Sequence, residues 1–149
     1  MRPIELYNST PLAEALIEFK QVPIQKHTKP CPAFPKHQEP IIKDGDRWIV
    51  GLYPIIGYLD RRIPWPGFYP FEPEEYAKVA MVLDLFLKTP PTANDWLPIV
   101  QHSRFVLGDT SCVVDVILAR LESDHPAWVD YVARVRAIPT ARSRASETA

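Results

Sequence analysis

The sequence has few of the features that mark secreted or membrane proteins. It contains only two cysteines, Cys31 and Cys112, so no disulfide framework is expected. No apolar run approaches the ~20 residues of a membrane span, and residues 1–10 lack the apolar core of a signal peptide. The net charge of −1 gives no overall attraction to nucleic acid or to an anionic membrane. We therefore expect a cytoplasmic protein that binds neither directly.

Proline, by contrast, is abundant, with 17 residues in the chain. Four of them lie in the segment 29–40, which therefore cannot form a helix of useful length. The apolar run 4–7 is typical of a buried strand, and Pro23 places the segment 22–28 at a sheet edge. The first part of the chain is expected to contain strands at 4–7 and 22–28, a helix at 11–21, a hairpin at 40–50 turning at Asp44-Gly45, and a helix at 54–63.

The second part of the chain is predicted to be helical. The segment 72–88 has an apolar stripe of Tyr76, Val79, Ala80, Leu83, Phe86 and Leu87. A weaker helix is expected at 94–103, a helix that is apolar on all sides at 111–121, and a last helix capped by Asp124. The expected domains are 1–63, a linker at 64–71, a helical domain at 72–138 and a disordered tail at 139–149.

Three stretches resemble glutathione-transferase-like proteins. "EPIIKDG" resembles the family's cis-proline strand, which implies a cis peptide between Glu39 and Pro40. "IIGYLDRRIPWPGFYP" resembles its third helix and linker, and "FVLGDTSCVVDVILARL" its buried core helix. The resemblance implies an α/β thioredoxin-like half, reduced because its second helix is missing, followed by a shortened all-α half. A homodimer is also implied.

Within this superfamily the chain is most similar to stringent starvation protein A, a non-enzymatic branch of bacterial regulators that associate with RNA polymerase. The likeness lies in the linker Pro64-Trp65-Pro66 and in the ending "WVDYVARVRAIPTARSRAS". It implies a role in transcription regulation with RNA polymerase as the protein partner.

The resemblance also predicts a degenerate ligand site at Pro40, Gly51 and Leu52. In the family, a Glu/Gln-Ser pair at the start of the third helix holds the γ-glutamyl carboxylate of glutathione. Gly51 and Leu52 supply neither side chain, and Pro54 lacks an N–H. Losing two or three charge-assisted hydrogen bonds lowers affinity by about a hundredfold or more. We therefore expect no cofactor and no catalytic residue.

An enzymatic alternative stays open at Tyr7 and Ser9, where family members carry a catalytic hydroxyl or thiol. Such a group would lower the thiol pKa of bound glutathione, the cofactor of this reading, as in a reduced transferase. Tyr7 is otherwise a strand-end aromatic residue that packs on the sheet. Retention on glutathione resin distinguishes the two readings.

Other reactive residues favour structural roles. Cys31 precedes a proline-rich segment instead of a helix, so we expect an inert thiol. His27 and Cys31 lie four residues apart without further ligand spacing, so no metal site is expected. Asp115 is expected to be structural, with Cys112 at the position where the family has a capping Ser or Thr. Either Ser111 caps in a shifted register or the cap is weakened.

The linker provides the candidate protein-binding residues, which are Pro64, Trp65, Pro66, Phe68 and Tyr69. Aromatic side chains on a proline-stiffened backbone lose little entropy on binding. The missing second helix is also expected to uncover one apolar face of the sheet. Both features favour a binding module over an enzyme.

Overall fold

The computed structural model describes residues 2–148, and the side chains of residues 2–139. The chain divides into two compact units, residues 1–65 and 66–149. The division falls inside the segment 64–71 that the sequence predicts to be a linker. Each unit is described by itself.

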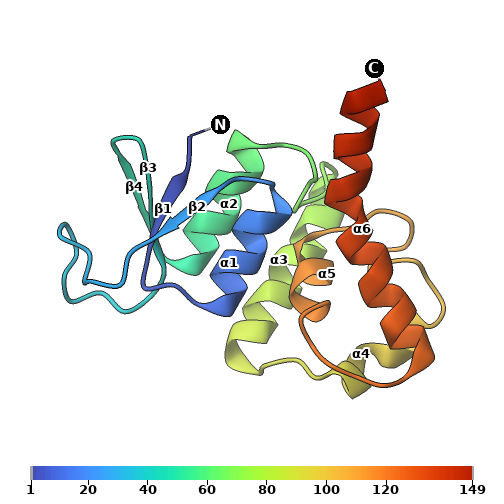
Figure 1. Cartoon of the computed structure of the whole chain (residues 1–149). Helices are drawn as coiled ribbons and strands as arrows, with labels where there is room; N and C mark the ends of the chain where they lie inside the picture. The colour runs from blue at the N-terminus through green and yellow to red at the C-terminus, as the bar shows by residue number, and fades with distance from the viewer. Residues whose placement is uncertain (1, 149) are drawn as a thin grey trace. The chain divides into compact units, whose positions relative to one another are not determined.

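The first unit is a four-stranded sheet with two helices (Figure 1). Its elements are β1 (Ile4–Tyr7), α1 (Pro11–Phe19), β2 (Ile24–Lys26), β3 (Ile41–Asp44), β4 (Arg47–Val50) and α2 (Leu52–Arg62). The strand order is β2-β1-β3-β4, with β1 parallel to β2 and the other pairs antiparallel. The sheet is thioredoxin-like, and β2 lies at the predicted edge.

Local signals explain both helices of this unit. Thr10 caps α1 by accepting a hydrogen bond from the Ala13 N–H at 3.1 Å, and Pro11 occupies the first turn. Helix α2 begins at Leu52, two residues before the predicted start, and ends at Arg62, before Pro64. Their apolar faces bury Ala13, Leu16, Ile17, Phe19, Ile55, Ile56 and Leu59.

The β3–β4 hairpin turns one residue later than predicted. Asp44 pairs with Arg47, so the two loop residues are Gly45 and Asp46. Gly45 has φ of 64°, a left-handed conformation that glycine adopts without a steric penalty.

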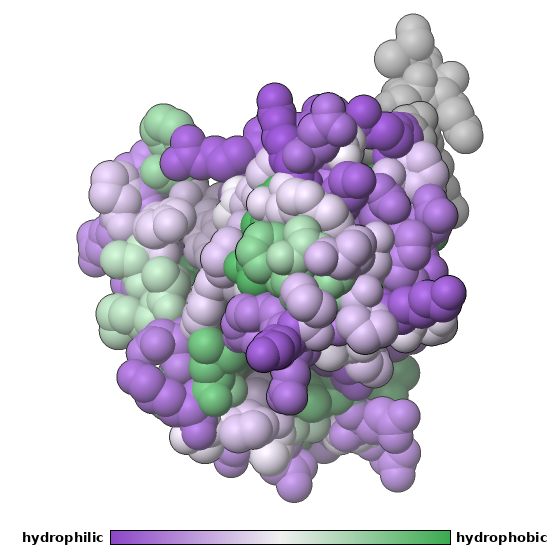
Figure 2. Space-filling model, turned by 90° about the vertical axis from the view of Figure 1, so that its left-hand side faces the viewer, coloured by the Kyte–Doolittle hydropathy of each residue, from purple (hydrophilic) through white to green (hydrophobic). Residues whose placement is uncertain are grey.

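The segment 29–40 forms no helix, as predicted, but it covers the sheet face that was expected to be exposed. Cys31 is buried there against Tyr7 and Ile41, with Trp48 and Val50 packed around it. Figure 2 shows this side of the molecule, where apolar residues reach the surface in patches bordered by hydrophilic ones. The expectation of an uncovered face is therefore corrected at Tyr7 and Ile41, which Cys31 covers, while Trp48 and Val50 stay partly exposed.

The second unit is helical, with α3 (Pro73–Lys88), α4 (Ala93–Val100), α5 (Val113–Leu118) and α6 (Pro126–Thr148). Every residue of α5 is buried, as its all-round apolar pattern predicts. On the predicted stripe of α3, Val79 and Leu83 are buried, whereas Tyr76 and Leu87 are exposed. The stripe is therefore narrower than predicted.

Helix α6 differs from the prediction at both ends. The Nδ1 atom of His125, instead of Asp124, accepts a hydrogen bond from the Ala127 N–H at 3.1 Å. The helix also continues through Pro139 to Thr148, past its predicted end. The disordered tail predicted for 139–149 falls mainly on residues whose side chains lie outside the described part. Within residues 2–148, no helix combines the length and apolar character needed to cross a membrane.

Candidate functional site

The N-terminus of α2 is the place where the sequence predicts a degenerate ligand site. Gly51 is its N-cap residue, with φ of 98° and ψ of 149°, and makes no side-chain cap. The Gly51 N–H donates to the carbonyl of the buried Pro40 at 2.9 Å, so this donor is already used. Leu52 is apolar, and Pro54 has no N–H to offer. The first turn of α2 thus has few groups with which to hold an anion.

The chain's own carboxylate lies beside this helix end. A Cβ atom placed on Gly51 would be 3.6 Å from Oε2 of Glu39. His37 holds the same oxygen, with its Nε2 atom 3.5 Å away. Asn8 fixes the backbone beneath them, because its Nδ2 donates to the carbonyls of His37 at 2.7 Å and Glu39 at 3.0 Å. A negative charge is favourable at a helix N-terminus, and the exposed carboxylate of Glu39 lies close enough to contribute one.

Tyr7 is packed under the 29–40 loop. Its ring stacks on His27 with centroids 4.3 Å apart and contacts Trp48 at 5.7 Å, and only 7% of the residue is exposed. Burial raises the pKa of Tyr7, and the charges of Glu5 and Cys31 raise it further. The hydroxyl therefore stays protonated, in a position that is largely closed to substrates.

Ser9 lies elsewhere and is exposed. Nζ of Lys26 lies 2.7 Å from Oε1 of Glu14, and this hydrogen bond lowers the pKa of Glu14. A hydrogen bond from Ser9 lowers the pKa of Glu14 to a smaller extent. The structure therefore places Ser9 with the charged pair of α1 and β2, away from the packed ring of Tyr7.

His27 and Cys31 are both engaged within the first unit. Nε2 of His27 lies 3.0 Å from Oε1 of Glu5, and the thiol of Cys31 is buried. Among the described residues, no group of three or more His, Cys, Asp or Glu side chains is arranged to hold a metal ion.

The predicted linker residues differ in their accessibility. Trp65 is 46% exposed, whereas Phe68 is fully buried and its carbonyl accepts the Val113 N–H at 2.8 Å. Pro64 is exposed, Pro66 is buried, and Tyr69 packs on Tyr76 with ring centroids 4.8 Å apart. Phe68 and Pro66 are thus unavailable to a partner, which corrects their assignment as contact residues.

Phe71, at the end of the predicted linker, is 98% exposed and is a further candidate contact residue. On α3, Tyr76 and Leu87 are exposed on one side of the helix, and Met81 and Leu85 are exposed on roughly the opposite side. The amphipathic pattern could not reveal these exposed residues, because it does not say which apolar residues find a partner within the chain.

Asp115 is fully buried at the start of α5. Its carboxylate accepts hydrogen bonds from the Cys112 N–H at 2.9 Å, the Val106 N–H at 3.0 Å and the Tyr131 hydroxyl at 2.6 Å. Cys112 is the N-cap residue, so the register is not shifted to Ser111. Burial raises the pKa of Asp115, although these hydrogen bonds oppose the rise.

The same site raises the pKa of the Cys112 thiol to about 12, through burial and then through the charge of Asp115. A thiolate at this helix end is thus strongly disfavoured. The carboxylate and the thiol together form a structural cap, and neither is accessible for chemistry.

Two buried charged groups were not found from the sequence. The side chain of Lys20 has no exposed surface and reaches Asp60 at 3.1 Å and the Ile63 carbonyl at 2.7 Å. Lys20 follows a short amphipathic helix, where lysines are usually exposed, so the sequence gives no signal of its burial.

Asp44 is the second of these groups. It accepts hydrogen bonds from the Tyr58 hydroxyl and from Arg2 at 3.2 Å, and Arg62 lies 3.7 Å away. Burial raises its pKa, but these partners outweigh burial and lower it overall. Because its partners come from distant parts of the chain, the pattern around the hairpin does not predict them.

Solved structures of glutathione transferases share this architecture. A Burkholderia glutathione transferase homologue with bound glutathione is 20% identical, with a TM-score of 0.57 and 98% of both chains covered. The theta-class enzyme of Xanthomonas axonopodis pv. citri, also with glutathione bound, is 17% identical with a TM-score of 0.65, covering 96% of this chain and 95% of that one. No protein-family model and no curated protein matches the sequence. The chain therefore has a glutathione-transferase-like fold, with a thioredoxin-like half and an all-helical half.

Proposed function

We propose that this protein is a non-enzymatic binding module built on the glutathione-transferase-like fold. The observation that carries the proposal is the lack of free ligand-holding groups at the α2 N-terminus. The Gly51 N–H is bonded to Pro40, and the carboxylate of Glu39 lies beside the helix end. A ligand carboxylate would meet a like charge there, in place of the donors that would hold it.

Protein binding is supported by exposed apolar side chains. Trp65, Phe71, Met81 and Leu85 are between 46% and 98% exposed. Large exposed aromatic and apolar residues are typical of surfaces that contact other proteins. The resemblance of the linker and of the C-terminal segment to stringent starvation protein A favours RNA polymerase as that partner. A second copy of the chain is the other candidate.

The alternative, a reduced glutathione-dependent transferase, has one observation in its favour. The raised pKa of Tyr7 keeps its hydroxyl protonated, as a donor to a thiolate must be. The packing of the ring against His27 and Trp48 opposes this reading, because a thiol has little access to it.

Glutathione binding and turnover test the proposal directly. The purified chain is expected to pass through glutathione resin and to show no conjugation of glutathione to an aryl halide. Conjugation above background that disappears in Tyr7→Phe would establish the enzyme and overturn the module. Tyr7→Phe keeps the ring stacking, so its fold can be checked by thermal melting.

A matched pair of tryptophan variants tests the protein-binding surface. Trp65→Ala is expected to leave folding intact and to weaken capture of purified RNA polymerase, because nearly half of the residue is exposed. Trp128→Ala is the contrasting variant. That ring is 1% exposed and its indole N–H donates to the Leu121 carbonyl at 2.9 Å, so its loss should cost about 3–5 kcal/mol.

A folded Trp65→Ala protein that captures the polymerase as well as the wild type would remove Trp65 from the surface. Phe71→Ala is then the next variant. If neither wild type nor variant binds the polymerase, light scattering at rising concentration decides whether a second copy is the partner.

A further inference from the structure

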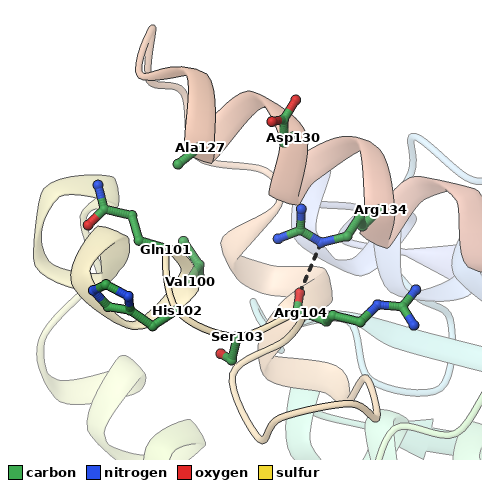
Figure 3. Close-up of a pocket in the computed structure, with 8 residues that line it drawn as sticks. All are labelled: Val100, Gln101, His102, Ser103, Arg104, Ala127, Asp130 and Arg134. Atoms are coloured by element: carbon green, nitrogen blue, oxygen red, sulfur yellow. Dashed lines mark hydrogen bonds between the residues drawn. The ribbon is translucent and has the colours of Figure 1, made fainter.

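A hollow of about 400 Å³ lies in the second unit, between the end of α4 and the first turns of α6. We call it the α4–α6 hollow. Residues 100–104 form one wall, and Ala127, Asp130 and Arg134 of α6 form the other (Figure 3). Its volume lies within the range of small-molecule sites.

The guanidinium group of Arg134 is held in a fixed position at the hollow. Its Nε atom donates to the Arg104 carbonyl at 3.2 Å, and its central carbon lies 6.0 Å from the ring centroid of Tyr131. Tyr131 is itself fixed by the hydrogen bond to Asp115. Figure 3 shows the terminal nitrogens of Arg134 in the space between the two walls. Positioning of this kind reduces the entropy lost on binding.

These terminal nitrogens have no acidic partner among the described side chains. Neither Arg134 nor Arg104 forms an ion pair within residues 2–139, whereas Lys78 and Lys88 each pair with a neighbouring acid on α3. Asp130 lies one helical turn before Arg134, but Figure 3 shows its carboxylate directed away from the guanidinium. The planar fork of an arginine forms two parallel hydrogen bonds with a carboxylate or a phosphate.

We propose that the α4–α6 hollow binds a small organic oxyanion, with the carboxylate or phosphate group on Arg134. Ala127, which is partly exposed in the wall of the hollow, provides apolar surface for the body of the molecule. Arg104 contributes its carbonyl, which holds Arg134, while its own guanidinium lies over the Phe105 ring and is directed away from the hollow (Figure 3). This site is separate from the α2 N-terminus and does not depend on the function proposed for the chain.

Titration of the full ¹⁵N-labelled chain with inorganic phosphate tests the site. Sodium chloride keeps the ionic strength constant, and a parallel titration with acetate distinguishes a preference for phosphate from one for carboxylate. We expect saturable amide shifts in residues 100–104 and 127–134. Arg134→Gln should weaken binding by about tenfold or more, because the charge-assisted pair of hydrogen bonds is lost.

Arg136→Gln is the matched control, since it removes the same charge from the same helix outside the hollow. It should change the affinity by less than about twofold, the effect of a distant surface charge. Arg134→Lys, which keeps the charge without the fork, replaces Arg134→Gln if that variant does not fold, and should also bind more weakly. Shifts that do not saturate with either anion, or equal weakening in Arg136→Gln, would overturn the proposal.

Discussion

The N-termini of α2 and α5 differ in the carboxylate that lies at each. At α5, the Asp115 carboxylate accepts a hydrogen bond from the N–H of Cys112, three residues earlier, in a capping box. At α2, Gly51 provides no side-chain cap, and the nearby carboxylate is that of Glu39, twelve positions earlier and across a strand pair. The first arrangement is local and buried, whereas the second is non-local and exposed.

The α5 N-terminus therefore bears on the stability of the chain, and the α2 N-terminus bears on whether it can bind a ligand. The α5 end contributes to the core, since the Asp115 carboxylate also accepts hydrogen bonds from the Val106 N–H and the Tyr131 hydroxyl. The α2 end is where the resemblance predicts a degenerate ligand site, and there the carboxylate of Glu39 lies nearby. Variants at these two ends should therefore differ in both the size and the kind of their effects.

The largest effect is expected at α5. Asp115→Ala leaves the Cys112 N–H, the Val106 N–H and the Tyr131 hydroxyl without their acceptor in a buried site. Unsatisfied buried groups cost about 1–3 kcal/mol each, so the free energy of unfolding should fall by roughly 3–5 kcal/mol after partial rearrangement. Urea denaturation measures this free energy, with a substitution of the exposed Asp130 of α6, Asp130→Ala, as the control.

A loss of only about 0.5–2 kcal/mol, as for an ordinary cap, would contradict this estimate. It would mean that water reaches the site in the variant and accepts the hydrogen bonds of the Cys112 N–H, the Val106 N–H and the Tyr131 hydroxyl in place of the carboxylate. Tyr131→Phe then shows which bond matters, since it removes the hydroxyl alone.

An intermediate effect is expected from the backbone of the α2 cap. Gly51→Ala places a Cβ on a residue with φ of 98° and ψ of 149°, a region open essentially only to glycine. The nearest atom, Cδ of Pro54, would be at an ordinary 3.4 Å, so the cost is conformational, about 1–3 kcal/mol.

Gly57→Ala in the same helix is its matched control. A Cβ there meets nothing within 4 Å, so this variant should stabilise the chain by about 0.5–1 kcal/mol. If both variants shift the melting temperature in the same direction, the backbone at Gly51 is not constrained as the structure has it.

The same contrast explains what could be predicted from the sequence. The β3–β4 hairpin apart from the position of its turn, the edge position of β2 and the buried α5 follow from local pattern and were predicted correctly. The role of Asp115 was anticipated from the resemblance to the family's core helix, but its contacts with Val106 and Tyr131 were not. Those contacts depend on how α6 and the 105–108 turn pack.

The candidate site was less predictable for the same reason. The absence of liganding side chains at Gly51 and Leu52 was visible in the sequence, whereas the position of Glu39 was not. Its place depends on Asn8, which holds the loop from the end of β1 with φ of 53°. The burial of Phe68 and of Lys20 likewise depends on tertiary contacts that periodicity does not encode.

The smallest effect is expected from Glu39 itself. Glu39→Gln keeps the shape of the side chain and removes its charge from the α2 N-terminus. An exposed charge at a helix end contributes about 0.3–1 kcal/mol at low salt, so the free energy of unfolding should fall by that amount. The difference should disappear in about 1 M NaCl, where the screening length is roughly 3 Å.

His37 complicates this measurement, because it lies 3.5 Å from the same carboxylate. Repeating Glu39→Gln in a His37→Gln background separates the helix from the histidine. If the loss persists, the helix end is its source, and Glu39 acts as the built-in anion of α2. If the loss vanishes, the carboxylate interacts only with the histidine and Glu39 is not the anion of the α2 N-terminus. In that case the exclusion of an anionic ligand depends on Gly51 and Leu52, and the double variant should still pass through glutathione resin.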